Sequence, residues 1–165
     1  MQLRDYRPAD ADIICGWITN ETALYEWSAD RYGTYPLTPA AIEANYGPLR
    51  GSRRFLPLTA VEENGDVLGH ILIRYPNEDD DRTVRFGFVI VDPAQRGKGL
   101  GSTMLRLAVT YAKDVLHARY IGLGVFEQNT AARRCYEAVG FAETGREAYP
   151  LPVGVWTCIE MGLSL

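Results

Sequence analysis

The chain has 165 residues, of which 47% are hydrophobic and 23% are charged, and its formal net charge is −4. A chain of this length and composition can bury a core without metal or disulfide support, so we expect one domain over residues 1–165. The acidic balance argues against a nucleic-acid-binding protein, which needs a basic excess, and no apolar run is long enough to span a bilayer.

The first third of the chain contains one clear helix and one weakly patterned stretch. A short strand is predicted over residues 3–6, followed by a helix from Asp10 to Ile18 with Asp10 as its N-cap. From residue 19 to residue 51 the apolar periodicity is weak, and we expect one helix over residues 39–46. Because an irregular, aromatic-rich connection inside a compact domain is more often functional than idle, part of a binding site is expected here.

The middle of the chain predicts three strands. Residues 55–75 hold two β-rich runs joined at Asn64-Gly65, which is the signal of a two-residue hairpin. An acidic, solvated turn follows. Residues 83–92 alternate at first and are then apolar from Phe88 to Val91. This change predicts a strand that enters as an antiparallel partner and ends buried on both faces, as parallel strands do.

The last third predicts two helices, a strand between them and a closing strand pair. A glycine-rich loop leads into a helix from about Leu100 to Val115, and a strand covers residues 120–126. A right-handed crossover makes that strand parallel to the one before it. The second helix runs from Asn129, a good N-cap, to Gly140, a good C′ residue, and two antiparallel strands follow. The expected architecture is α/β, around a mixed sheet that is antiparallel at both ends and parallel in the middle.

The glycine-rich loop RGKGLGS, residues 96–102, is the first candidate binding segment. A helix N-terminus leaves backbone N–H groups unpaired and carries a partial positive charge, and glycines let a ligand approach that backbone closely. With the charges of Arg96 and Lys98, the loop favours a di-anionic group such as a pyrophosphate. The alternative is a strand-to-helix turn that only needs positive φ angles. The Walker loop is absent, and the dinucleotide fingerprint fails because residue 102 is Ser.

The second candidate segment is NTAARRCYEAVGF, which begins at Asn129. Asn129 and Tyr136 are seven residues apart, close to two helical turns, and therefore lie on one face of the second helix. Ala132 lies between them on the same face and is small enough to let a ligand lie close. Taken alone, Tyr136 is better interpreted as an ordinary core aromatic residue.

Together the two segments resemble the GNAT superfamily of N-acetyltransferases. The acetyl-CoA pyrophosphate loop of that superfamily has the pattern (Q/R)-x-x-G-x-(G/A), which this chain matches at Arg96, Gly99 and Gly101. Its N-x-x-A-x-x-x-Y-x-x-x-G-F segment is matched at Asn129, Ala132, Tyr136, Gly140 and Phe141. The resemblance covers residues 82–142 well and the rest in element order. The two ends of the chain are loosely similar to the branch that acetylates ribosomal-protein N-termini.

The resemblance implies a three-layer fold whose central parallel strand pair splays apart to admit acetyl-CoA as cosubstrate, with about four flanking helices. Gly87 is compatible with the β-bulge that this splay requires. The resemblance also implies that Tyr136 is the general acid for the leaving thiolate. The residues that it implies for binding acetyl-CoA are Val89, Ile90, Val91, Arg96, Gly97, Lys98, Gly99, Leu100, Gly101, Ser102, Asn129, Ala132 and Tyr136.

The general base is not identified by the sequence. Many relatives carry a glutamate on the fourth strand, where this chain has Arg85 and Gly87. Glu26, Asp30 and Glu127 are candidates, each also readable as a surface charge, and a water chain could serve instead.

The acceptor is expected to be a primary amine, either on a small molecule or at a peptide N-terminus. Glu26, Trp27 and Tyr32 are the candidate substrate residues. The other aromatic residues that could line an acceptor pocket, or simply cover the edge of the core, are Tyr25, Tyr35 and Trp156.

No metal or membrane partner is expected. His70 and His117 have no partner at metal-ligand spacing and are interpreted as structural. Cys15, Cys135 and Cys158 form no CxxC pair and are expected as free thiols in a cytoplasmic protein. A homodimer is a candidate assembly. Two other functions remain open: a coenzyme A-binding module without catalysis, and a nucleotide-binding regulator that uses the same glycine loop.

Overall fold

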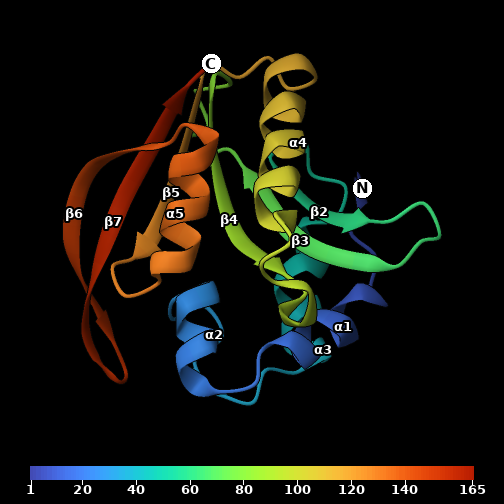
Figure 1. Cartoon of the computed structure of the whole chain (residues 1–165), viewed down its shortest axis with the longest axis vertical. Coiled ribbons are helices and arrows are strands. Elements are labelled where there is room, and N and C mark those ends of the chain that lie inside the picture. The colour runs from blue at the N-terminus through green and yellow to red at the C-terminus, as the bar shows by residue number, and fades with distance from the viewer.

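A seven-stranded sheet forms the centre of the molecule, and the computed structural model describes all residues from 1 to 165 (Figure 1). The strand order is β1-β2-β3-β4-β5-β7-β6, and every neighbouring pair is antiparallel except β4 and β5. The elements in chain order are β1 (Gln2–Asp5), α1 (Asp10–Trp17), α2 (Glu21–Ser28), α3 (Pro39–Tyr46), β2 (Phe55–Val61), β3 (Val67–Arg74), β4 (Thr83–Val91), α4 (Leu100–Asp114), β5 (Tyr120–Phe126), α5 (Thr130–Val139), β6 (Ala142–Leu151) and β7 (Gly154–Ser164). The predicted fold class is confirmed. No helix has the length and apolar character needed to cross a membrane.

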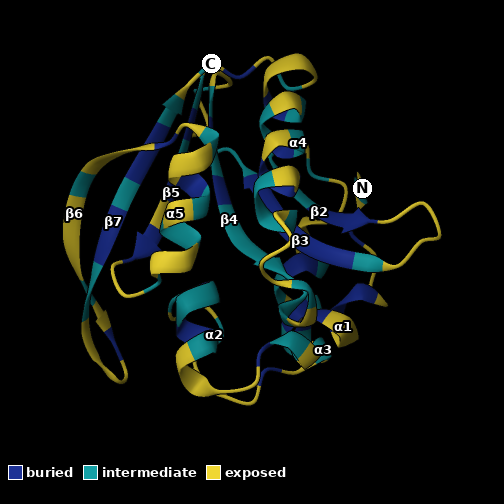
Figure 2. Ribbon diagram, viewed as in Figure 1, coloured by how far each residue is buried: buried dark blue, intermediate teal, exposed yellow.

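Helices cover the two faces of the sheet in separate layers. A core cluster of 18 buried residues joins α4 and α5 to β2, β3, β4, β5 and β7. A second cluster of 8 buried residues joins α1, α2 and α3 to Tyr6, just after β1, and contacts Phe88 and Ile90 of β4. Figure 2 shows that β3 is buried along most of its length, whereas β6 at the sheet edge is largely exposed. The strand β4 therefore lies between both helical layers.

The strands β4 and β5 are paired only at their beginnings. Their register joins Thr83 to Tyr120, Val84 to Ile121 and Arg85 to Gly122, and no pair follows. Beyond this point β4 stays with β3 and β5 stays with β7, so the two strands move apart (Figure 1).

A β-bulge accompanies this parting. Leu72 pairs with Gly87 and His70 pairs with Ile90, which leaves two β4 residues opposite one β3 residue. The bulged residue is Phe88, with a φ of 49°, rather than the predicted Gly87. The apolar run that begins there was predicted to be buried on both faces, and this is wrong, because its residues are only half-buried where β5 has departed.

The helix boundaries follow from local capping. The Asn129 side chain accepts a hydrogen bond from the Ala132 N–H at 3.3 Å, and Gly140 ends α5 with a φ of 112°, as predicted. The helix α2 is an addition to the prediction and brings the number of α-helices to five. Its signal is Asn20, whose side chain accepts from the Ala23 N–H at 2.8 Å. The hairpin at Asn64-Gly65 is looser than predicted, since the last paired residues are Val61 and Val67.

Asp10 anchors the N-terminal layer instead of capping α1. Its carboxylate accepts hydrogen bonds from the Arg4 guanidinium at 2.7 and 2.8 Å, from the Arg7 N–H at 2.8 Å and from the Thr59 hydroxyl at 2.8 Å. Burial alone would raise the pKa of Asp10, but these hydrogen bonds outweigh it and the pKa is lowered. The side chain therefore ties β1, α1 and β2 together as a carboxylate.

Replacing this carboxylate should destabilise the fold in a pH-dependent way. For Asp10→Asn we expect the free energy of unfolding to fall by about 3 kcal/mol at neutral pH, because Arg4 loses its buried partner. The folded pKa is depressed, so the contribution is complete above the ordinary carboxyl pKa near 3.9 and is lost as the pH falls through the folded value. Urea unfolding at several pH values measures this. Asp12→Asn, at an exposed position in the same helix, is the control, and a difference between the variants that did not shrink as the pH was lowered below about 3.9 would contradict the assignment.

Candidate active site

A cavity of about 390 Å³ opens where β4 and β5 part. Its walls come from the diverging halves of both strands, the beginning of α4, the inner face of α5, and α2. Every residue that the sequence predicted for acetyl-CoA binding lines this cavity except Lys98. A more open hollow of about 650 Å³ adjoins it beside the connection between α1 and α2, and Glu26 and Arg96 line both. The fold thus brings the glycine loop and the α5 segment to one place.

The glycines of the loop meet two separate steric demands. Gly97 and Gly99 have φ angles of 80° and 74°, in the left-handed region that other residues rarely adopt. Gly101 has no such angle, but a Cβ there would lie 3.0 Å from the Cys135 sulfur on α5. Turn geometry and helix packing therefore account for all three glycines without a ligand. The interpretation as a phosphate-binding loop depends instead on its hydrogen-bond donors and charges.

The loop also offers unsatisfied donors. The helix α4 begins after Gly99 with no side-chain cap, so its first-turn N–H groups have no side-chain acceptor. These groups carry the positive end of the helix dipole at the cavity edge, and the exposed Arg96 adds a formal charge there. This donor set fits a pyrophosphate, and the bare backbone at Gly97 and Gly99 leaves it accessible.

Tyr136 lies on the α5 wall of the cavity and is 6% exposed. Its ring packs edge-on against Phe141 with the centroids 6.1 Å apart. The hydroxyl has no hydrogen-bond partner within the chain, and it is not among the fully enclosed polar atoms that lack one. Burial, and to a smaller degree the Cys135 thiol, raises the pKa of Tyr136, so the phenol stays protonated throughout the neutral range.

Aromatic residues close the cavity on the side of α2. Trp27 stacks on Tyr32 at a centroid distance of 5.7 Å and packs on Phe88 at 5.1 Å. The indole N–H of Trp27 is enclosed and has no partner. Tyr32 stands behind Trp27 and does not line the cavity.

The remaining aromatic candidates lie elsewhere. Tyr25 and Trp156 belong to a separate cluster with Phe126. The Tyr35 hydroxyl donates to the Thr19 carbonyl oxygen at 2.8 Å.

The three candidate bases lie in different surroundings. Glu26 lines the cavity, and its pKa is raised by burial against the opposing charge of Arg96. Asp30 accepts a hydrogen bond from the Tyr149 hydroxyl at 2.9 Å, and Glu127 forms an ion pair with Arg146 at 2.7 Å. Of the three, only Glu26 lines the cavity.

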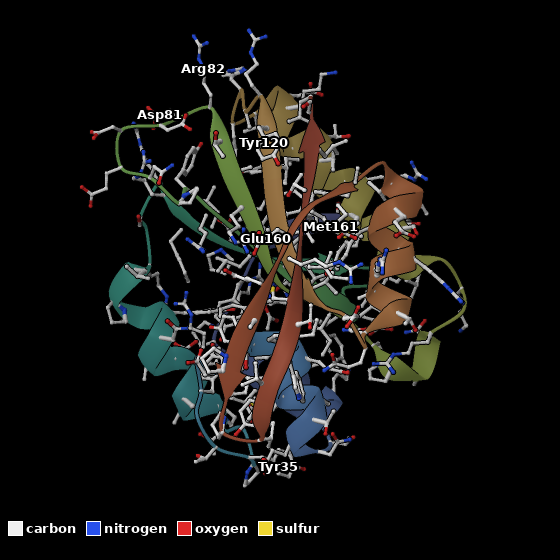
Figure 3. The ribbon with its side chains drawn as sticks, turned by 90° about the vertical axis from the view of Figure 1, so that its left-hand side faces the viewer. Tyr35, Asp81, Arg82, Tyr120, Glu160 and Met161 are labelled. Carbon is white, nitrogen blue, oxygen red and sulfur yellow. The ribbon has the colours of Figure 1, made fainter.

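An ion pair that was not predicted from the sequence crosses β5 at the point where β4 and β5 part. Arg85 on β4 donates to both carboxylate oxygens of Glu160 on β7, at 2.7 and 2.8 Å, and Figure 3 shows Glu160 near the middle of this sheet face. The guanidinium passes over β5 because Gly122 and Gly124 have no side chains: a Cβ at Gly124 would lie 2.9 Å from Arg85 Nη2. The glycines of YIGLGVF were the available signal. The two partners of the ion pair, Arg85 and Glu160, are 75 residues apart in sequence.

His70 and the three cysteines pack in or against the core, whereas His117 is exposed. His70 is fully buried with its Nε2 2.8 Å from the Tyr46 hydroxyl, and burial lowers the pKa of His70 to about 4. All three cysteines are free thiols. The group Glu147, Cys158 and Glu160 has metal-ligand spacing, but Arg85 occupies both oxygens of Glu160, and neither histidine belongs to the group.

Comparisons with known proteins agree with this geometry. The profile of the "Acetyltransferase (GNAT) family" matches residues 21–141. Spermine/spermidine N(1)-acetyltransferase of Bacillus subtilis is 31% identical over 85 residues, which cover 49% of this chain and 56% of that protein. Streptothricin acetyltransferase of Streptomyces lavendulae is 26% identical over 165 residues, covering 89% of this chain and 84% of that protein. The chain thus spans about half the length of the first of these relatives.

A solved structure shares the whole fold. Spermidine N-acetyltransferase from Vibrio cholerae, in complex with CoA and spermine, matches with a TM-score of 0.81 at 20% identity, over 99% of this chain and 94% of that one. At this level of identity the likeness shows the fold alone.

The arrangement around β5 can be tested with a pair of glycine substitutions. Gly124→Ala should lower the free energy of unfolding by about 1–3 kcal/mol, because the methyl group meets Arg85 and the Cys158 sulfur. Gly145→Ala on β6 is the control, since a Cβ there meets nothing within 4 Å. Urea unfolding compares the two variants, and equal losses of stability would show that the Arg85 side chain can pass over β5 without a glycine at residue 124.

Proposed function

The chain belongs to the acetyltransferase (GNAT) family, and we propose that it transfers the acetyl group of acetyl-CoA to a primary amine by direct attack, with Tyr136 as proton donor. One observation carries this proposal: a single cavity at the parting of β4 and β5 contains both the uncapped beginning of α4 and the unpartnered Tyr136 hydroxyl. When bound, acetyl-CoA supplies the acetyl thioester.

Backbone groups would hold and orient the cosubstrate. The first-turn N–H groups of α4 face the place where a pyrophosphate fits, and Arg96 adds charge. Along β4, residues 89–91 line the cavity on the edge that β5 has left, so main-chain groups on that edge have no strand partner. Such preorganised donors can bind amides and stabilise negative charge on a carbonyl oxygen during attack.

Tyr136 would act as a proton donor to the leaving sulfur. A phenol has a reference pKa near 10 and a thiol near 8.5, and burial raises the pKa of Tyr136 further, so complete transfer to a free thiolate is uphill. The useful contribution is therefore a hydrogen bond that stabilises charge on sulfur while the carbon–sulfur bond breaks. The attacking nitrogen gives up one proton to the base or to water, and the released thiolate takes one proton from water, so the transfer balances.

Glu26 is the base that we propose to test first. It alone of the three candidate carboxylates lines the cavity, and a raised pKa makes it a stronger base. The acceptor cannot be carried over from the relatives, because one is named for polyamines and another for streptothricin.

A thiol-release assay separates this function from the two alternatives. Thiol release from acetyl-CoA with an amine supports transfer, whereas binding without release supports a non-catalytic module. Stabilisation against heating by ATP or NAD, and not by acetyl-CoA, would support a nucleotide-binding regulator.

The role of Tyr136 predicts a specific kinetic change. For Tyr136→Phe we expect kcat to fall by about 10²–10⁴-fold, since a proton donor is lost, with little change in the affinity for acetyl-CoA. Tyr111→Phe on α4, outside the cavity, should keep the wild-type rate. An unchanged kcat in the Tyr136 variant would remove the residue from this role.

The role of the loop predicts a difference between two glycines with the same backbone conformation. Gly99 and Gly33 have φ angles of 74° and 72°, and a Cβ at either meets nothing within 4 Å. Each Gly→Ala change should cost about 1–2 kcal/mol of stability. Only Gly99→Ala should also weaken acetyl-CoA binding, by several-fold, when measured by calorimetry. Equal weakening in both variants would argue against the loop as the binding segment.

A further inference from the structure

Arg74, beside the cavity, is a half-buried cation without a counter-ion. Arg74 is the last residue of β3 and lies directly opposite Arg85 of β4. Its neighbour Ile73 and the flanking β4 residues Val84 and Phe86 point into the core beneath α4 and α5. Because strand side chains alternate, Arg74 and Arg85 project from the other face, together with Gly87.

The two opposed arginines differ in how their charges are balanced. Arg85 is held by both oxygens of Glu160, and nearby Arg54 pairs with Asp81. Arg74 has neither an ion pair nor a side-chain hydrogen bond, although its side chain is half-buried. Burial lowers the pKa of Arg74, the charges of Arg85 and Arg31 lower it further, and Glu160 offsets only part of this. A half-buried charge without a partner is costly, so the site is suited to an anion that the chain itself does not supply.

Arg74 is also close to the place where an acceptor would meet the cavity. Gly87 lines the cavity and follows Arg85 by two residues, about 6.6 Å along an extended strand. A Cβ at Gly87 would meet nothing within 4 Å, so the space in front of this part of β4 is open. A molecule that entered the parting of the strands from this face would have its far end within reach of the long Arg74 side chain.

We propose that Arg74 binds a carboxylate of the acceptor, and that the acceptor is therefore an amine that carries a carboxylate, such as an amino acid. This inference rests on the proposed function and names its substrate class. A guanidinium matches a carboxylate with two parallel hydrogen bonds. A single negative charge is favoured over a phosphate dianion, because Glu160 and the exposed Glu147 lie on the same sheet face. Arg31 and Arg74 would repel a polyamine.

The test uses amines that differ only in the carboxylate. Calorimetry on the CoA-saturated protein compares L-lysine with cadaverine and with L-lysinamide, and L-phenylalanine with phenethylamine and with L-phenylalaninamide. Spermidine represents the polyamines. We expect at least one of the two amino acids to bind about tenfold or more tightly than both the amine and the amide with which it is compared.

The variants assign that preference to one side chain. Arg74→Gln should abolish the difference, and Arg74→Lys should keep part of it. Arg119→Gln, an exposed control just before β5, should keep all of it. Arg74→Gln should also unfold at the same or a higher urea concentration than the wild type, because it removes an unpartnered charge. A purely structural arginine would instead lose stability when replaced.

Two results would overturn the inference: spermidine or cadaverine binding as tightly as every carboxylate, or a preference that survives in Arg74→Gln. Thiol release from acetyl-CoA is measured in parallel with the same amines. Release with polyamines alone refutes the carboxylate site and leaves the acetyltransferase function standing. Carboxylate binding that depends on Arg74, without thiol release from any amine, supports the carboxylate site and refutes the catalytic proposal.

Discussion

Two neighbouring strands that pair at only three positions determine where every part of this site can lie. Parallel pairing between β4 and β5 stops after Arg85 and Gly122, and each strand then follows its other neighbour. The edge that β5 leaves keeps its main-chain donors and acceptors, and buried groups of this kind require partners. The cavity is the space in which a ligand can provide those partners.

Several features hold the parting open at a defined place. The Phe88 bulge turns β4 and brings its ring against Trp27 of α2. On the closed side, the Arg85–Glu160 pair links β4 to β7 across β5 just where the strand pairing ends. The gap between β4 and β5 is therefore closed by the ion pair at Arg85 and is lined by aromatic rings farther along β4. The Tyr136 phenol comes from the opposite helical layer.

The parts of the structure that sequence predicted well are those with local causes. The caps Asn129 and Gly140 and the left-handed Gly97 and Gly99 each follow from the chemistry of one residue and its near neighbours. Element order and the parallel pair followed from hydrophobic patterns. The helix α2 escaped detection although Asn20 marked its beginning.

The features that escaped prediction depend on distant residues. Nothing near Arg85 identifies Glu160, 75 residues later, as its partner, and the unpaired state of Arg74 is only visible once its neighbours are in place. The apolar run from Phe88 to Val91 was assigned to burial between parallel neighbours. In the structure the same residues line a cavity, and apolar side chains suit the wall of a cavity as well as they suit a buried strand.

The two glycines of β5 limit how a protein with this arrangement can change the acceptor that it binds. Gly122 and Gly124 present no side chains to the face that Arg85 crosses, and a larger residue at Gly124 would collide with the crossing guanidinium. Variation in acceptor recognition must then come from β3, β4, β7 and the aromatic segment after α2. A laboratory library aimed at new acceptors should therefore keep Gly122 and Gly124 and vary the flanking strands.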